Sequence, residues 1–301
     1  MPVTCLWKIF TATSKLLCQM LQIALPNKGA LATDAVELIR AAGYKCRRSG
    51  RELRVRDTDN QVLFYFLRPR DIATYVSNGV LDLGIIGRDF LNEQQAGLEE
   101  ILSLGFGTAR LCYAGPRDRG LTPDQFDGLR IATSFSHLVS ADLKKRKIQA
   151  EIVPLDGAVE VSIQLGVADI IADLVQTGRT LEDAGLSVIG EPILRTEAVL
   201  TGRTGTVEAK SAADLFVRRI QGILLARTYV MIEYGCPRSS LERVCEITPG
   251  IESPTIAPLS KPDWIAVKAL AKREEANQIM DDLERLGATG IVITDIRTCR
   301  I

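Results

Sequence analysis

The chain has 301 residues, of which 46% are hydrophobic and 25% are charged, and its 37 basic side chains balance its 37 acidic ones. Zero net charge argues against a general nucleic-acid surface or a polybasic membrane surface, and the length suggests about two domains, or three small ones. The single histidine, His137, excludes a multi-histidine metal site and any histidine triad not built on that residue. Chemistry must therefore depend mainly on carboxylates, cations, hydroxyls and backbone amides.

The seven cysteines are scattered and show no metal-type spacing, which predicts reduced thiols in a cytoplasmic protein. No apolar run approaches the roughly 18 residues that a membrane-spanning helix needs. Residues 1–19 carry Lys8 and Lys15 as their charges and lack the pattern of a signal peptide. We expect a disordered extension or a start codon assigned too early, with Met20 as the natural beginning.

From residue 20 to about residue 109, short apolar runs alternate with helical periodicity. Strands are predicted at 21–25, 53–55, 62–67 and 81–86, and helices are predicted after Gly29 and from Pro69. This βαβ alternation is typical of a parallel or mixed sheet. We assign residues 20–109, together with about 197–208, to a first catalytic lobe.

The second lobe is predicted over residues 110–196. Its strands are expected at 129–133, 152–155 and 170–175, with a helix over 157–166. A further strand near Glu197 continues without a linker and is expected to return to the first lobe. Two lobes joined by two crossovers form a hinge with a cleft, an arrangement that often encloses a small molecule. The expected body is therefore α/β and similar to the periplasmic binding proteins.

After residue 208 the pattern changes to one long connecting helix, predicted over 209–228. Residues 229–301 then show the order βαββαβ, which is typical of the split βαβ, ferredoxin-like plan. A small module of this kind, similar to ACT domains, suggests a regulatory domain.

The segment 170–181 is the most informative for chemistry. A predicted strand containing Asp173 runs into Thr177-Gly178-Arg179-Thr180 and then a helix. Such a turn presents amides and hydroxyls at a positive helix end, which is what a phosphate requires. Asp173, at the carboxyl end of its strand, can accept hydrogen bonds from two sugar hydroxyls beside that phosphate.

Plain structural roles explain the same residues when each is taken alone. Thr180 is then a helix N-cap and Gly178 an ordinary turn residue. Asp156 is another N-cap, Glu160 a first-turn partner of the helix dipole, and Lys28 a solvated loop lysine.

Several motifs along the chain resemble one enzyme family. The run from Glu160 to Leu181 matches the signature of ATP phosphoribosyltransferase, the first enzyme of histidine biosynthesis. Further matches are Pro-Asn-Lys-Gly (26–29), Phe-Leu-Arg-Pro (66–69), Gly-Arg-Asp (87–89) and Ser-Pro-Thr-Ile-Ala-Pro-Leu (253–259). The resemblance extends from Met20 to Ile301, and the extra domain places the chain with the long form of the family.

The resemblance implies that N1 of the adenine of ATP attacks the anomeric carbon of phosphoribosyl pyrophosphate (PRPP), with Mg²⁺ as cofactor. Pyrophosphate leaves, and an oxocarbenium-like transition state is expected. An anionic leaving group needs little acid–base machinery, so positioning and electrostatic stabilisation dominate. The ion would be held mainly by substrate phosphates, so no dedicated metal cage is expected in the protein.

The resemblance also implies roles for individual residues. Asp173, Lys28 and Arg68 are the expected catalytic residues, and Gly29, Asp89 and Phe135 are expected at the ATP side of the cleft. PRPP is expected to bind Asp156, Glu160, Asp173, Thr177, Gly178, Arg179 and Thr180.

Phe135 stands where relatives often carry a tyrosine, so it keeps a ring for stacking but lacks the hydroxyl.

In the C-terminal module the resemblance implies inhibition by histidine at Thr255, Leu270 and Gly290. Gly235 stands where relatives often have Asp or Asn, which predicts weaker histidine binding. The family also suggests a homo-oligomer, either a dimer or a hexamer, without nucleic-acid or membrane partners.

Two alternatives share the expected architecture. A prephenate-dehydratase-like enzyme also joins a two-lobed cleft to an amino-acid-sensing module, but it needs no phosphate turn. A two-lobed ligand-binding sensor would lack catalysis, and the fused regulatory module argues against it.

Overall fold

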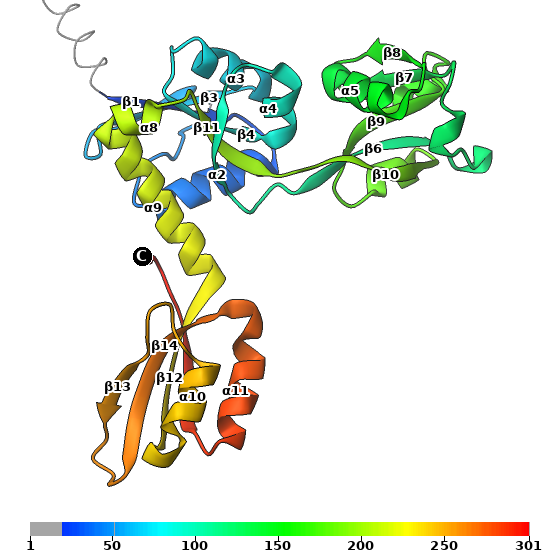
Figure 1. The fold of residues 1–301 in the computed structure, drawn as a ribbon. Coiled ribbons are helices and arrows are strands. Elements are labelled where there is room, and N and C mark those ends of the chain that lie inside the picture. Colours follow the sequence, from blue (N-terminus) through cyan, green and yellow to red (C-terminus); the bar gives the residue numbers. More distant parts are fainter. Residues whose placement is uncertain (1–19, 51, 301) are drawn as a thin grey trace, which may run out of the picture. The chain divides into compact units, whose positions relative to one another are not determined.

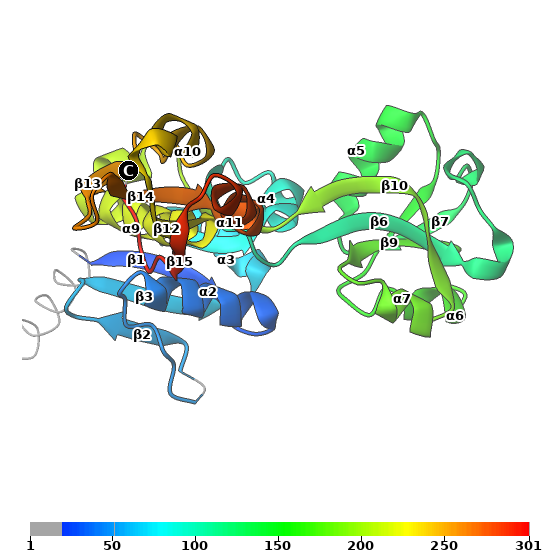
Figure 2. The same cartoon turned by 90° about the horizontal axis from the view of Figure 1, so that it is seen from below.

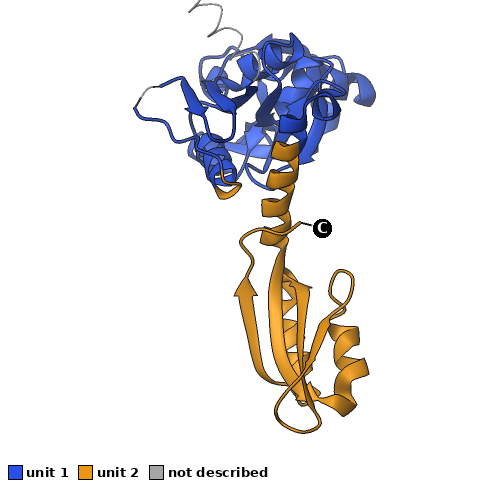
Figure 3. Ribbon diagram, turned by 90° about the vertical axis from the view of Figure 1, so that its left-hand side faces the viewer, with its two compact units in different colours: residues 1–40, 44–214 blue, residues 41–43, 215–301 orange. Residues whose placement is uncertain are grey.

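The computed structural model describes residues 20–50 and 52–300, so the extension expected over residues 1–19 lies outside the described residues. The chain divides into two compact units (Figure 3), residues 1–40 with 44–214 and residues 41–43 with 215–301. No helix among the described residues is long and apolar enough to cross a membrane.

The first lobe is built on a six-stranded sheet with the order β2-β3-β1-β4-β11-β5 (Figure 1). Strand β1 is parallel to β3 and β4, whereas β11 is antiparallel to both β4 and β5. Its strands are β1 (Leu21–Pro26), β2 (Arg54–Asp57), β3 (Val62–Leu67), β4 (Leu83–Gly87), β5 (Glu99–Ser103) and β11 (Ala198–Gly202), and its helices are α2 (Ala30–Ala41), α3 (Pro69–Ser77), α4 (Arg88–Gln94) and α8 (Thr206–Ala209).

Burial explains the apolar composition of this sheet. All five residues of β4 are buried, as expected for a central strand with both faces covered. A Cβ at Gly84 would lie 2.5 Å from Cγ2 of Ile72, so the glycine allows α3 to pack closely on β4.

The second lobe contains a five-stranded sheet with the order β10-β6-β9-β7-β8. Strand β7 is parallel to β8 and β9, and β6 is antiparallel to β9 and β10. Its elements are β6 (Ala109–Pro116), β7 (Arg130–Thr133), α5 (Ser136–Arg146), β8 (Glu151–Pro154), α6 (Val161–Gln164), β9 (Ile170–Val175), α7 (Arg179–Asp183) and β10 (Leu186–Thr196), with 3₁₀ turns at Arg117–Arg119 and Pro123–Gln125.

The two faces of this second sheet have separate cores. Leu181 of α7 packs with Cys112, Ile171 and Val175 on one face, whereas Val139 of α5 packs with residues of the other face. The side chains of β9 alternate, so Asp173 shares the face of α7 with Ile171 and Val175.

The prediction of a helix over 157–166 is wrong in its length, because α6 covers only Val161–Gln164. Gly157 and Ala158 have φ angles of +90° and +49°, and Gly166 has +69°. These left-handed residues do not continue a right-handed helix, so only one turn fits between them.

The two crossovers between the lobes lie side by side, as Figure 2 shows for β6 and β10. Thr196, the last residue of β10, pairs with Ala109, the first residue of β6. The Glu197 carboxylate then accepts hydrogen bonds from Ser103 Oγ at 2.8 Å and from the Gly105 amide at 3.1 Å. Glu197 therefore ties one crossover to the other.

Helix α9 (Ser211–Thr228) precedes a four-stranded antiparallel sheet with the order β13-β14-β12-β15. This order confirms the expected ferredoxin-like domain, and the alternating buried residues of β12 pack towards α10 and α11. The elements are β12 (Tyr229–Pro237), α10 (Leu241–Ile247), β13 (Thr255–Pro258), β14 (Trp264–Lys272), α11 (Ala276–Arg285) and β15 (Thr289–Asp295), with 3₁₀ turns at Arg238–Ser240 and Arg273–Glu275.

Candidate active site

The turn between β9 and α7 is built on a left-handed glycine. Gly178 is left-handed, with φ +86° and ψ −7°, and α7 begins at the next residue, Arg179. A Cβ at Gly178 would have only Val175 Cγ1 near it, at 4.0 Å, so backbone conformation rather than space requires the glycine. The N-cap is Gly178 itself, and the plain alternative that Thr180 caps the helix is wrong because Thr180 lies inside α7.

This turn opens into a cavity of about 410 Å³, here called the phosphate-turn cavity. The first lobe contributes Leu31, Gly87, Asp89, Phe90 and Gly107, the second lobe contributes Glu160, Asp173, Thr177, Gly178 and Thr180, and the crossover strands contribute Ala109 and Thr196. The structure thus brings most of the predicted PRPP residues together and places Asp89 opposite them.

Asp173 lies at the centre of the second-lobe wall. Its Oδ1 accepts a hydrogen bond from the amide of Leu174 at 2.8 Å, and the structure gives its side chain no other hydrogen bond among the described residues. Burial raises the pKa of Asp173, the Leu174 amide opposes that rise, and the Glu160 carboxylate adds to it. Asp173 therefore offers acceptor oxygens in a poorly solvated position, where hydroxyl donors of a ligand are favourable partners.

Asp89 faces the same cavity from the first turn of α4 and is 3% exposed. The Thr196 hydroxyl donates to Asp89 Oδ1 at 2.7 Å and accepts from the Asp89 amide at 3.0 Å. Burial raises the pKa of Asp89, and the bond from Thr196 opposes the rise. A Cβ at Gly87 would lie 2.1 Å from Asp89 Oδ1, so this residue must be glycine for the carboxylate to fold back.

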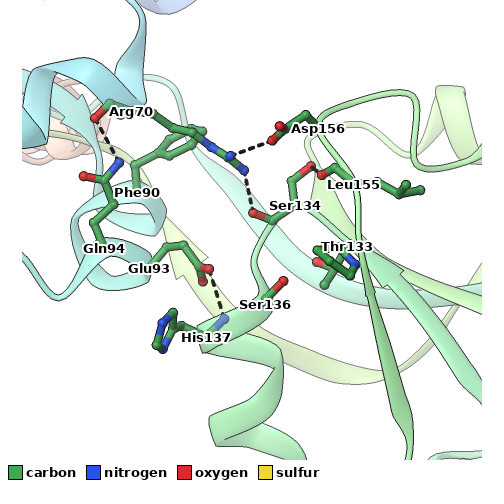
Figure 4. A pocket seen from close by; sticks show the side chains of 11 residues that line it. Arg70, Phe90, Glu93, Gln94, Thr133, Ser134, Ser136, His137, Leu155 and Asp156 are labelled. Carbon is green, nitrogen blue, oxygen red and sulfur yellow. Dashed lines mark hydrogen bonds and ion pairs between the residues drawn. The ribbon is translucent and has the colours of Figure 1, made fainter.

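A second cavity of about 490 Å³, here called the interlobe pocket, lies beside the first (Figure 4). Arg70 of α3 forms an ion pair with Asp156 of the second lobe at 2.5 Å and donates to the Ser134 carbonyl at 3.0 Å. Phe90 lines both cavities and is therefore their common wall. Asp156 thus contacts the first lobe, and its interpretation as an N-cap is wrong because α6 begins only at Val161.

Two predicted aromatic and imidazole positions lie on the same segment. The Phe135 ring is 3% exposed and packs against Phe90 with 5.4 Å between ring centroids. His137 is exposed and lies in the first turn of α5. Phe90 was not predicted, although it follows the predicted Gly87-Arg88-Asp89 directly; only its position between two cavities distinguishes it.

Lys28, Gly29, Arg68, Phe135 and Arg179 do not line either cavity. Lys28 and Arg68 are exposed and follow the carboxyl ends of the parallel strands β1 and β3, whose last residues pair with each other. In open α/β sheets ligands bind outside this edge. Glu160 precedes α6 directly and has no side-chain capping bond.

The three predicted histidine-site residues lie on three different strands. Thr255 begins β13 at one edge of the sheet, Leu270 lies on β14, and Gly290 lies on β15 at the other edge with φ +61°. Two strands separate Thr255 from Gly290, so the sheet of one chain does not bring these two residues together.

Within residues 20–50 and 52–300, no cluster of three or more His, Cys, Asp or Glu side chains could hold a metal ion. The cavity walls carry single carboxylates, Asp89, Glu160 and Asp173, on separate elements. Such a site suits an ion that brings its own phosphate ligands, since Mg²⁺ is often bound by one or two carboxylates and substrate phosphates.

Comparisons with known proteins cover both compact units. A family model described as ATP phosphoribosyltransferase matches residues 68–222, and one described as the HisG C-terminal domain matches residues 226–298. An ATP phosphoribosyltransferase from Salinibacter ruber is 58% identical over 283 residues, which are 94% of this chain and 100% of that protein. One from Mycobacterium tuberculosis is 49% identical over 283 residues, 93% of this chain and 100% of that protein.

A solved structure, the ATP phosphoribosyl transferase (HisG:HisZ) complex from Thermotoga maritima, has a TM-score of 0.57 and 26% identity. The match covers 67% of this chain and 99% of that one.

Proposed function

The chain belongs to the ATP phosphoribosyltransferase family, and we propose that it carries out the family's reaction in the phosphate-turn cavity. It is a pentosyltransferase that condenses ATP with PRPP to give phosphoribosyl-ATP and pyrophosphate, the first step of histidine biosynthesis. Neither a prephenate-dehydratase-like enzyme nor a non-catalytic sensor agrees with these relatives.

PRPP binds with its 5-phosphate in the turn Thr177–Thr180 and its ribose hydroxyls on Asp173. One observation carries this proposal: the turn and the Asp173 carboxylate line the same cavity. Gly178 brings amides towards the phosphate, the hydroxyls of Thr177 and Thr180 add donors, and Arg179 supplies charge at the start of α7. Glu160, which also lines this cavity, lies beside the sugar. Asp156 lies at the edge of the interlobe pocket and contributes to sugar binding from there.

ATP approaches from the interlobe pocket, with its adenine against Phe90. This ring lines both cavities, so a base stacked on it lies between the pocket and the ribose. Phe135 supports the Phe90 ring from behind, at 5.4 Å between centroids. Gly29 and Asp89 complete the first-lobe side of the cleft.

The reaction is a substitution at the anomeric carbon, and the protein's task is to hold N1 and that carbon in line. Positive charge develops on the sugar in an oxocarbenium-like transition state, and the Asp173 carboxylate next to it stabilises that charge. Lys28 and Arg68, at the carboxyl ends of β1 and β3, neutralise the departing pyrophosphate.

Enzymes of this family generally need a divalent metal, and we propose Mg²⁺. It would be held mainly by substrate phosphate oxygens, with Asp89 or Asp173 as the protein carboxylates within the cavity, and would supply positive charge to the diphosphate.

Histidine is the proposed feedback inhibitor, bound in the ferredoxin-like domain near Thr255, Leu270 and Gly290. The proposed enzyme is a homo-oligomer in the cytoplasm, and the five free cysteines among the described residues are in keeping with that compartment. Inhibition by added histidine that is weakened in Thr255→Ala would support this site, whereas equal inhibition of both proteins would move the sensor elsewhere.

The deciding assay mixes the full-length protein with ATP, PRPP and Mg²⁺ and follows phosphoribosyl-ATP and pyrophosphate by chromatography. Product is expected with both substrates and none when either is omitted.

Asp173→Asn and Thr180→Ala should each raise the KM for PRPP or lower kcat while the circular dichroism spectrum persists. Wild-type kinetics in both variants would remove this turn from the site.

A further inference from the structure

Two arginines face each other directly at the hinge end of the second-lobe sheet. Arg110 of β6 and Arg195 of β10 are Cα partners in an antiparallel ladder. Directly opposed residues lie on the same face, with roughly 5 Å between their Cβ atoms, and like charges there destabilise the pair. An anion between the two side chains would remove that repulsion.

No carboxylate of the chain fills this role in the part that the structure describes. Neither the Arg110 nor the Arg195 side chain forms an ion pair or a hydrogen bond there. The neighbouring Arg88 is different, because its guanidinium donates to both Glu100 oxygens at 2.7 Å and to Glu197 at 3.0 Å. Glu197 therefore pairs with Arg88, and the guanidinium groups of Arg110 and Arg195 have no carboxylate partner among the described residues.

These arginines line a third cavity of about 360 Å³, here called the hinge cavity. The hinge cavity shares Ala109, Val175, Gln176 and Thr196 with the phosphate-turn cavity. Gln176 leads directly into the Thr177–Thr180 turn. The two cavities are therefore neighbours on either side of the same strand ends.

Strand register places Arg110 on the ligand-facing side of the sheet. Arg110 pairs with Val175 and Cys112 pairs with Asp173, so these side chains share the face that carries α7. Burial raises the pKa of the Cys112 thiol, the Glu191 carboxylate adds to that rise, and both arginines oppose it, so the two cations and one carboxylate act on this face.

The backbone next to Arg195 is irregular in a way that often accompanies binding sites. The register between β10 and β6 shifts between Ile189 and Leu194, immediately before Arg195. Bulges re-aim the side chains that follow them and are frequent beside active sites.

We propose that Arg110 and Arg195 form a subsite for a polyphosphate chain, the chemical group that PRPP and ATP share. Guanidinium groups bind phosphate oxygens in a bidentate fork, which a lysine cannot do. The subsite rests on the proposed function, because the phosphates that it takes are those of the two substrates. It lies next to the turn that holds the 5-phosphate and extends the anion-binding surface towards the hinge.

The test compares the full-length protein with Arg110→Gln, Arg195→Gln and the double variant. Titration calorimetry measures PRPP, ATP and inorganic pyrophosphate separately at one fixed salt concentration. The double variant should bind the relevant anion about 10- to 100-fold more weakly, since hydrogen bonds to charged groups are each strong. A loss for PRPP alone assigns the subsite to its diphosphate, and a loss for ATP alone assigns it to the triphosphate.

Thermal unfolding separates binding from a structural role. Removing two opposed like charges should leave Tm unchanged or raise it, whereas arginines that held the fold together would lower it when replaced. The double variant Arg110→Lys with Arg195→Lys keeps both charges and should keep part of the affinity for the anion. Arg117→Gln is the matched control, because Arg117 is exposed and follows the opposite end of β6, and it should leave all three affinities unchanged.

Several outcomes would overturn the subsite. One is a folded double variant with wild-type affinity for all three anions, and another is a wild type that binds none of them. A change in oligomeric state by size exclusion, with anion affinities unchanged, would assign the pair to a contact between copies instead. Product formation by the wild type decides the proposed function separately, and pyrophosphate binding tests the arginines whether or not product forms.

Discussion

Glu93 of α4 and Leu138 of α5 lie in different lobes, yet a carboxylate oxygen of Glu93 accepts the Leu138 amide at 3.0 Å. The other oxygen accepts the amide of His137, also at 3.0 Å (Figure 4). Both amides belong to the first turn of α5, whose positive end favours a carboxylate. Glu93 thus caps a helix of the opposite lobe and joins the two lobes at the interlobe pocket.

Replacing Glu93 by Gln should loosen this contact between the lobes. A lost cap of this kind costs about 1 kcal/mol, so the KM values for both substrates should rise roughly threefold to tenfold while the fold persists. Steady-state kinetics measures the effect. Glu151→Gln, an exposed carboxylate on β8 without a hydrogen bond of its own in the described structure, is the control. Equal KM values in Glu93→Gln and Glu151→Gln would show that substrate binding does not depend on this contact.

Gly178→Ala should weaken PRPP binding and lower stability together. A non-glycine residue in the left-handed region costs about 1–2 kcal/mol, and here the strain falls on the phosphate turn. Gly166 is also left-handed, with φ +69°, and lines neither the phosphate-turn cavity nor the interlobe pocket. Gly166→Ala should therefore show a similar loss in urea unfolding with an unchanged KM for PRPP. If the two variants have the same KM, the turn does not contact PRPP.

Asp173 should make stability depend on pH. Its folded-state pKa is raised, mainly by burial, so between its unfolded and folded pKa values the folded state binds more protons than the unfolded state. This contribution is present at acid pH and is lost as the pH rises through the folded pKa. Relative to the wild type, the Tm of Asp173→Asn should therefore increase from acid to neutral pH. A Tm difference that stays constant across that range would contradict the raised pKa.

Thr196→Val should destabilise the first-lobe wall of the cavity. The change removes the hydroxyl that donates to the buried Asp89 carboxylate at 2.7 Å and accepts its amide at 3.0 Å. Losing one hydrogen bond to a buried charged group costs about 1.5–3 kcal/mol, which urea unfolding would detect. Thr196→Ser keeps the hydroxyl and should lose much less. Comparable losses in both variants would show that the Thr196 hydroxyl is not what stabilises this wall.

The local sequence pattern was sufficient to predict those helices and strands whose own residues show a clear apolar run or periodicity. Strand β9 was predicted at its observed bounds, 170–175, because an apolar run ends there at a polar, glycine-containing turn. The βαββαβ order of the last domain was likewise predicted from hydrophobic periodicity. In contrast, β6 and β10 were not predicted, and their pairing joins residues far apart in the chain.

The sequence by itself determined the α/β class, the ferredoxin-like domain and a turn suited to phosphate, because each depends on residues close together in the chain. Only the tertiary structure placed Asp89 against Thr196, Glu93 at the start of α5, and Arg110 opposite Arg195. These contacts join residues between 45 and 107 positions apart. Strand register and the packing of the two lobes determine these contacts, and neither can be predicted from the spacing of residues along one segment.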